Sequence, residues 1–106
     1  MDIVNFLNLT ERLIEEMSRI SKEVFIVNEL GLHARSAAMI SKIARTAASN
    51  VWIAKGGKTV DASSVLDILT LACEKGTKIT LEIDDPSDMD VLNEIERMVG
   101  SGFGEK

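Results

Sequence analysis

The stretch VWIAKGGKTVDA, residues 51–62, decides the fold. Its first half, Val51–Lys55, is rich in β-forming residues, and Gly56-Gly57 is a two-residue turn of the kind that closes a hairpin. The chain then returns through residues 58–62. Because so short a connection joins antiparallel strands, the sequence predicts antiparallel pairing at this point of the sheet.

The segments on either side of the hairpin alternate between strand and helix patterns. Residues 78–84 alternate apolar and polar side chains, which is typical of a strand with one covered and one wet face. A further strand is predicted at 24–27. Three helices are predicted: the first spans 34–48, the second runs from Val65 to near Cys73, and the third begins after Pro86. Gly76 is placed to end the second helix. The order from residue 23 is β-α-β-β-α-β-α. It predicts an α+β fold, a two-layer open-faced sandwich in which a four-stranded, mainly antiparallel sheet carries three helices on one face.

Residues 1–22 are predicted to form an amphipathic helical extension ahead of a domain spanning 23–106. Asn8 and Glu11 have the spacing of a capping box. Apolar residues recur at helical intervals at Phe6, Leu9, Leu13, Met17 and Ile20. Such a helix packs either on its own domain or on another chain, self-association included. Two arginines beside four carboxylates argue against binding at a membrane surface.

At 106 residues the chain fits one globular domain, and its scarce residues limit the chemistry. A lone cysteine, Cys73, forbids an internal disulfide, and Cys73 with the single histidine His33 cannot supply the ligands of a zinc site. We expect no metal and no cofactor, because the acidic cluster at 84–90 lacks calcium-loop spacing and Gly57-Lys58-Thr59 lacks the first glycine of a phosphate-binding loop. With no apolar run long enough to cross a bilayer and no signal-peptide pattern, we expect a cytoplasmic protein.

The charge of the chain is unevenly distributed. A net charge of −5 argues against nucleic acid as the main partner. Residues 30–60 nevertheless contain no acidic residue, whereas residues 82–96 contain no basic one. The basic residues of the first segment are Arg35, Lys42, Arg45, Lys55 and Lys58. Both segments fit ordinary solvated faces, but the positive one surrounds His33 and would attract an acidic partner or a phosphoryl group.

The segment GLHARSAA, residues 31–38, carries the candidate chemistry. Gly31 allows a tight turn, and His33 falls where the next helix begins. The first backbone N–H groups of a helix lack intrahelical partners, and together with the helix dipole and Arg35 they suit a doubly charged anion. An imidazole nitrogen is a nucleophile near neutral pH, which favours a phosphoryl group on or beside His33. The alternative is a histidine that only caps the helix.

This segment resembles the active-site sequence of HPr, the histidine-containing phosphocarrier of the phosphoenolpyruvate-dependent sugar phosphotransferase system. Residues 58–73 are similar to the regulatory-serine helix of that family, and Lys75-Gly76-Thr77 to the turn after it. Phe103-Gly104-Glu105 is similar to the family's C-terminus. The resemblance covers residues 23–106, and the predicted element order is the one that this family has.

The resemblance implies a role for each matching residue. His33 would accept the phosphoryl group from enzyme I on its δ1 nitrogen and pass it to a IIA-type component, and Arg35 would neutralise the phosphoryl charge. Ser64 matches the serine that HPr kinase/phosphorylase modifies in some bacteria. The residues implied for an apolar docking surface are Val65 and Leu66, with Ile68 or Leu69. A protein of this kind is a carrier and not an enzyme that turns over.

The chain departs from the family pattern at four places. Ser36 replaces the usual proline, and its hydroxyl could donate a hydrogen bond to a phosphoryl group. Leu30 and Ser63 replace a common asparagine and lysine, and the helix at 1–22 has no counterpart in the short standard carrier. These departures leave two alternatives open. One is a regulatory paralogue that signals through the same His33 chemistry, and the other is an interaction module that works through the N-terminal helix.

Overall fold

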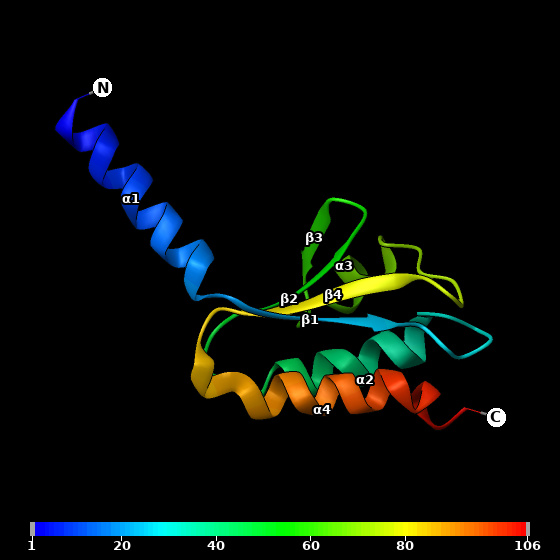
Figure 1. The fold of residues 1–106 in the computed structure, drawn as a ribbon. Helices are drawn as coiled ribbons and strands as arrows, with labels where there is room; N and C mark the ends of the chain where they lie inside the picture. Colours follow the sequence, from blue (N-terminus) through cyan, green and yellow to red (C-terminus); the bar gives the residue numbers. More distant parts are fainter. Residues whose placement is uncertain (1, 106) are drawn as a thin grey trace.

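The computed structural model describes residues 2–105 and contains an open sheet with helices packed on it (Figure 1). Helix α1 (Ile3–Ser18) comes first and leads into strand β1 (Ile20–Phe25). The remaining elements are α2 (Ala34–Ala44), β2 (Val51–Lys55), β3 (Lys58–Asp61), α3 (Val65–Leu69), β4 (Lys78–Ile83) and α4 (Met89–Gly100), with 3₁₀ turns η1 (Pro86–Asp88) and η2 (Gly102–Gly104). The predicted order β-α-β-β-α-β-α and the α+β class are confirmed. No helix within residues 2–105 is long and apolar enough to cross a membrane.

The four strands form one sheet in the order β1-β4-β2-β3. All three neighbouring pairs are antiparallel, with Val24 opposite Ile79, Ile53 opposite Leu81, and Lys55 opposite Lys58 beside the hairpin turn. The predicted two-residue turn therefore sets the pairing at one end of the sheet. Since β1 and β3 lie at the two edges, the central position of β4 joins the first strand to the hairpin.

The core lies on one face of this sheet. Ile53, Ile79 and Leu81 point inward and are fully or almost fully buried, whereas their sequence neighbours Trp52 and Thr80 are half-exposed on the other face. The helices contribute Ile40, Ile68, Leu92, Ile95 and Val99 to the same buried cluster. Each of these aliphatic side chains gains about 2 kcal/mol from leaving water, and this shared burial holds α2, α3 and α4 on one side of the sheet.

The junction between α1 and β1 differs from the prediction. The helix ends at Ser18, and residues 20–22, predicted as its last turn, already belong to β1, where Ile20 lies opposite Ile83. The helix also begins earlier than the predicted cap at Asn8 and Glu11, because the Asp2 carboxylate accepts the backbone N–H of Asn5 at 2.8 Å. The side chains of residues 15–18, including that of Met17, lie outside the described set.

Three other boundaries also differ from the prediction. Strand β1 ends at Phe25 and not at Val27, and α2 ends at Ala44, four residues before the predicted end. Helix α3 stops at Leu69, well before Cys73 and Gly76. The Thr70 hydroxyl donates to the Asp67 carbonyl at 2.6 Å, and the backbone then turns through a positive φ of 51° at Ala72. These local contacts consume the carbonyl groups that a longer helix would need.

Candidate functional site

The loop between β1 and α2 is held against the loop that precedes β4. Gly31 has a φ of +64°, and a Cβ atom there would lie 2.3 Å from the Cys73 carbonyl oxygen. The next residue, Leu32, donates its backbone N–H to that same oxygen at 2.9 Å. Only glycine combines this backbone conformation with this close approach. The two loops therefore fix the backbone immediately before His33.

His33 is the N-cap of α2 and is bonded at both its backbone and its ring. The ring nitrogen Nδ1 accepts the backbone N–H of Arg35 at 3.3 Å. The backbone N–H of His33 donates to Ser36 Oγ at 2.9 Å, which completes a capping box. An Nδ1 atom that accepts a hydrogen bond carries a lone pair, so the ring proton resides on Nε2. The Nδ1 lone pair thus points to the N-terminus of α2, where the sequence predicts a site that receives an anion.

Ser36 lies in the first turn of α2 and is fully buried. Its hydroxyl accepts from His33 and lies within donating distance of the carbonyl oxygens of Gly31, at 3.1 Å, and His33, at 3.2 Å. A hydroxyl has one hydrogen to donate, and here it is directed at a backbone carbonyl oxygen. In this arrangement Ser36 positions the cap, and donating to a phosphoryl group would break one of these bonds.

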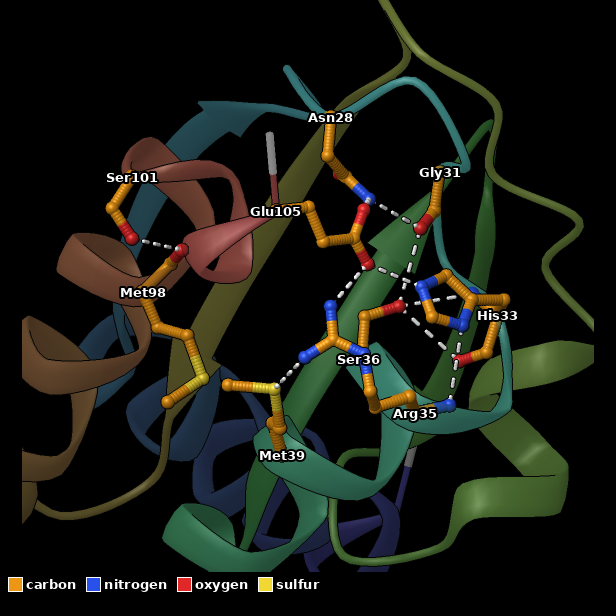
Figure 2. Close-up of polar contacts among 9 residues, drawn as sticks. All are labelled: Asn28, Gly31, His33, Arg35, Ser36, Met39, Met98, Ser101 and Glu105. Carbon is orange, nitrogen blue, oxygen red and sulfur yellow. Dashed lines mark hydrogen bonds and ion pairs between the residues drawn. The ribbon is translucent and has the colours of Figure 1, made fainter.

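Glu105 brings a carboxylate to the other side of the His33 ring (Figure 2). Its Oε1 lies 2.5 Å from His33 Nε2 and 2.7 Å from Arg35 Nη2, and its Oε2 accepts from Asn28 Nδ2 at 2.8 Å. The hydrogen bonds from His33, Asn28 and Arg35 hold the pKa of the Glu105 carboxyl below its ordinary value, against the opposing effect of burial. The carboxylate is therefore charged at neutral pH and orients the ring.

Arg35 has the most exposed of the charged side chains at this site. Its side chain is 54% exposed, compared with 28% for His33 and 12% for Glu105. The guanidinium joins the Glu105 carboxylate to the thioether of Met39, whose sulfur lies 3.6 Å from Nη1. A long side chain with this exposure can turn toward a new anion without disturbing the core.

Sequence reasoning missed Glu105 and Asn28 as site residues. Asn28 is buried, and its amide also donates to the Gly31 carbonyl at 2.8 Å, so it ties the loop to the carboxylate. Glu105 reaches the ring because Phe103 is buried with a φ of +59°, which turns the chain back after α4. The similarity of Phe103-Gly104-Glu105 to a family sequence was the available signal, but it gave no indication of contact with His33.

The predicted regulatory and docking residues lie on α3, which packs beside α2. Ser64 is its N-cap and accepts the Asp67 backbone N–H at 3.3 Å. Leu66 is 76% exposed, and Val65 and Leu69 are half-buried. Ile68 is fully buried in the core, so its prediction as a docking residue is wrong. In so short a helix, one apolar residue has to face inward to hold the helix on the domain.

Two other potentially reactive side chains, those of Cys73 and Lys55, have structural roles. Within residues 2–105, no group of three or more His, Cys, Asp and Glu side chains is arranged to hold a metal ion. Cys73 is buried, and burial raises the pKa of its thiol, although the charge of Lys55 opposes the effect. Lys55 itself donates to the carbonyls of Leu71 and Ala72 at 2.9 and 3.1 Å and fastens the turn after α3.

Comparison with known proteins shows that most of the chain matches one protein family. The family model described as "PTS HPr component phosphorylation site" matches residues 20–101. Phosphocarrier protein HPr of Cupriavidus necator is 33% identical over 86 residues, which cover 81% of this chain and 97% of that protein. The crystal structure of HPr-C-His from Thermoanaerobacter tengcongensis has a TM-score of 0.77 at 29% identity, covering 82% of this chain and 98% of that chain. The crystal structure of a phosphocarrier protein HPr from Bacillus anthracis str. Ames has a TM-score of 0.72 at 30% identity, covering 77% of this chain and 98% of that chain. The family match begins after α1.

Proposed function

The chain belongs to the HPr family of phosphocarrier proteins, and from this premise we propose that His33 accepts a phosphoryl group from phosphorylated enzyme I and passes it to a IIA-type protein. One observation carries the proposal: the two ring nitrogens of His33 are held by different groups. Nδ1 accepts the Arg35 backbone N–H at the N-terminus of α2, and Nε2 contacts the carboxylate of Glu105. This arrangement favours attack by Nδ1 and retention of the proton on Nε2.

The transfer step follows from this tautomer. The Nδ1 lone pair forms a bond to phosphorus while the bond between phosphorus and the donor atom of enzyme I breaks, and the electron pair of that bond returns to enzyme I. No proton has to leave His33 during the step. The ring gains positive charge as the new bond forms, and the Glu105 carboxylate at 2.5 Å from Nε2 stabilises that charge.

The phosphoryl oxygens have donors in place on the other side of the ring. The Arg35 backbone N–H, which now contacts Nδ1, is free to bind an oxygen once that lone pair is used. The exposed Arg35 guanidinium is shared with Glu105 and can turn to the phosphoryl group, adding a charge-assisted hydrogen bond. The protein thus acts as a carrier that two other proteins load and unload, and we place it in the cytoplasm with them.

We further propose that partner proteins dock on the exposed side of α3 next to α2, with Leu66 at the centre and Val65 and Leu69 beside it. Ser64 is the proposed target of HPr kinase/phosphorylase. A phosphate on Ser64 would stay near the first N–H groups of α3 and add negative charge next to Leu66. We propose that the N-terminal helix is an extension outside the carrier domain, with the boundary at residue 20, where β1 begins, and not at residue 23 as the sequence predicted.

A direct test is to incubate the full chain with phosphoenolpyruvate and enzyme I and to measure acid-labile phosphate on the protein. We expect incorporation that His33→Ala abolishes, and nitrogen NMR of the product should place phosphorus on Nδ1. Phosphoramidate, a small-molecule phosphoryl donor, provides a second arm that needs no enzyme I. If wild type and His33→Ala give the same result with both donors, the proposed function is wrong.

A further inference from the structure

Helix α1 carries an apolar stripe that its own domain leaves uncovered. Five large side chains of this stripe are between 49% and 76% exposed, namely Ile3, Phe6, Leu7, Leu13 and Ile14. The family match begins at residue 20, so the carrier domain is complete without this helix. Exposed apolar stripes of this extent mark a surface that binds another macromolecule.

The width of the stripe indicates the kind of surface that it fits. Ile3, Phe6 and Leu7 occupy positions i, i+3 and i+4, and the pattern repeats seven residues later with Thr10, Leu13 and Ile14. Thr10 fits an apolar stripe because its hydroxyl bonds the Phe6 carbonyl at 2.9 Å. Three positions in every seven form the broad face of a helix that packs on two neighbours, whereas a two-stranded coiled coil uses the narrower two.

The carrier domain has a matching groove between α2 and α4. A hollow of 350 Å³ is lined by the apolar side chains of Met39, Ile43 and Met98 and is flanked by Lys42, Thr46 and Glu94. Met39 and Met98, which lie close together in Figure 2, also line the adjoining hollow that runs toward Phe103. Methionine side chains are flexible and polarisable, so a groove lined with them adapts to the side chains of an incoming helix.

The charges of α1 and of the α2 wall of the groove are complementary, whereas α4 contributes one residue of each sign, Glu94 and Arg97, to the two hollows. Residues 2–18 contain four acidic residues and one basic residue. Helix α2, on one side of the groove, contains Arg35 and Lys42, has Arg45 as its C-cap and contains no acidic residue. Electrostatic complementarity of this kind favours the pairing of α1 with α2 over the pairing of two acidic α1 helices.

A joint at the base of α1 fastens Arg19, the residue that follows the helix, to the sheet. Arg19 Nε lies 3.1 Å from Asp84 Oδ1, and the Trp52 indole N–H donates to the same oxygen at 3.0 Å. The Arg19 guanidinium also lies 6.0 Å from the centre of the Trp52 ring. With this joint formed, α1 projects from the sheet on the side away from α2 and α4 (Figure 1). The groove is therefore open to a helix from another copy.

We propose that two copies of the chain exchange their N-terminal helices, so that α1 of each packs into the α2–α4 groove of the other. The exchange makes the same contact twice around a two-fold axis, which doubles the buried apolar surface and closes the assembly as a dimer. The dimer forms whether or not His33 carries a phosphoryl group, so this proposal does not rest on the proposed function.

Sedimentation velocity of the full chain over a wide range of concentrations tests the helix. We expect a dimer of twice 11.6 kDa. Leu7→Asp should weaken dimerisation by about a hundredfold, because it places a charge in the groove and removes one buried leucine side chain. Asn8→Asp is the matched control, since it adds the same charge one residue later on the polar side, and it should remain dimeric.

Two variants test the groove. Thr46→Trp fills the hollow from an exposed position and should give a monomer, whereas Thr59→Trp places the same side chain on exposed strand β3 and should leave the dimer intact. Circular dichroism melting checks that each variant is folded. A wild-type monomer, a dimer that survives Leu7→Asp, or a dimer that Thr46→Trp leaves intact would each overturn the proposal. A tetramer would do the same, since it indicates a bundle made of α1 helices.

Discussion

Glu105 and His33 lie 72 positions apart in the sequence, and their side chains meet at 2.5 Å between Oε1 and Nε2. This contact divides the imidazole into two functional halves. The carboxylate holds the protonated nitrogen, so the other nitrogen keeps its lone pair at the start of α2. The carboxylate also accepts a hydrogen bond from the Arg35 guanidinium at 2.7 Å. An incoming phosphoryl group can compete with Glu105 for this guanidinium. Loading of the carrier is therefore expected to depend on Glu105.

Replacing Glu105 by glutamine should slow phosphorylation of His33 by enzyme I by about tenfold, because the positive ring would lose a charge-assisted hydrogen bond. Rapid-quench measurement of acid-labile phosphate gives the rate. Glu29→Gln is the matched control, since Glu29 lies in the loop before His33 and pairs with Lys75 on the surface. Equal rates for Glu105→Gln and wild type would show that the carboxylate has no part in the transfer.

The folded protein should lose stability in acid through Glu105. The pKa of this carboxyl is lowered in the folded state, mainly by the His33 hydrogen bond. Its stabilising contribution is therefore complete above the ordinary glutamate pKa of about 4.3 and disappears as the pH falls through the lowered value. Urea unfolding at a series of pH values should show wild type more stable than Glu105→Gln near neutrality, with the difference shrinking below about pH 4. A difference that grows on acidification would contradict this sign.

Ser36→Ala should lower the free energy of unfolding by about 1 kcal/mol, because it removes the acceptor of the His33 backbone N–H and opens the capping box. Chemical denaturation measures the loss. Ser87→Ala serves as the control, because Ser87 is exposed and its bond to Asp85 uses the backbone N–H, which alanine keeps. If both variants lose the same amount, Ser36 does not stabilise the cap.

Gly31→Ala should destabilise the protein by about 3 kcal/mol or more, since the new Cβ would meet the Cys73 carbonyl at 2.3 Å in a strained backbone conformation. Gly56→Ala separates the two causes. Gly56 has a similar φ of +55° but no atom within 4 Å of an added Cβ, so it should lose only about 1 kcal/mol. Matched denaturation curves for the two variants would mean that the loop relaxes around the alanine.

The sheet and most of the site could be predicted because their determinants are local. The glycine pair at 56–57 requires a hairpin, and alternation along 78–84 marks a strand with one covered face. His33, Arg35 and Ser36 fall within one helical turn, so their spacing places them together. Ile20 shows where local pattern fails, because it continues the apolar spacing of the helix before it and also alternates with Lys22 and Val24 in the strand.

Two features of the site depend on contacts that no local pattern contains. Glu105 and Asn28 meet only after α4 has packed on the sheet and the chain has turned at Phe103. In α3, four of five residues are apolar, so the sequence offers no polar side to show that Ile68 faces inward while Leu66 faces solvent. Tertiary packing determines both the contact of Glu105 with Asn28 and the side of α3 that faces the core.

The joint at the base of α1 gives the protein a built-in optical probe. Trp52 is the only tryptophan of the chain, and its indole N–H shares the Asp84 carboxylate with Arg19. The emission of an indole responds to the charges and the water around it. Because the guanidinium next to the ring is carried by the residue that follows α1, any swing of that helix would shift the fluorescence spectrum. Movement of the extension can thus be followed in unlabelled protein.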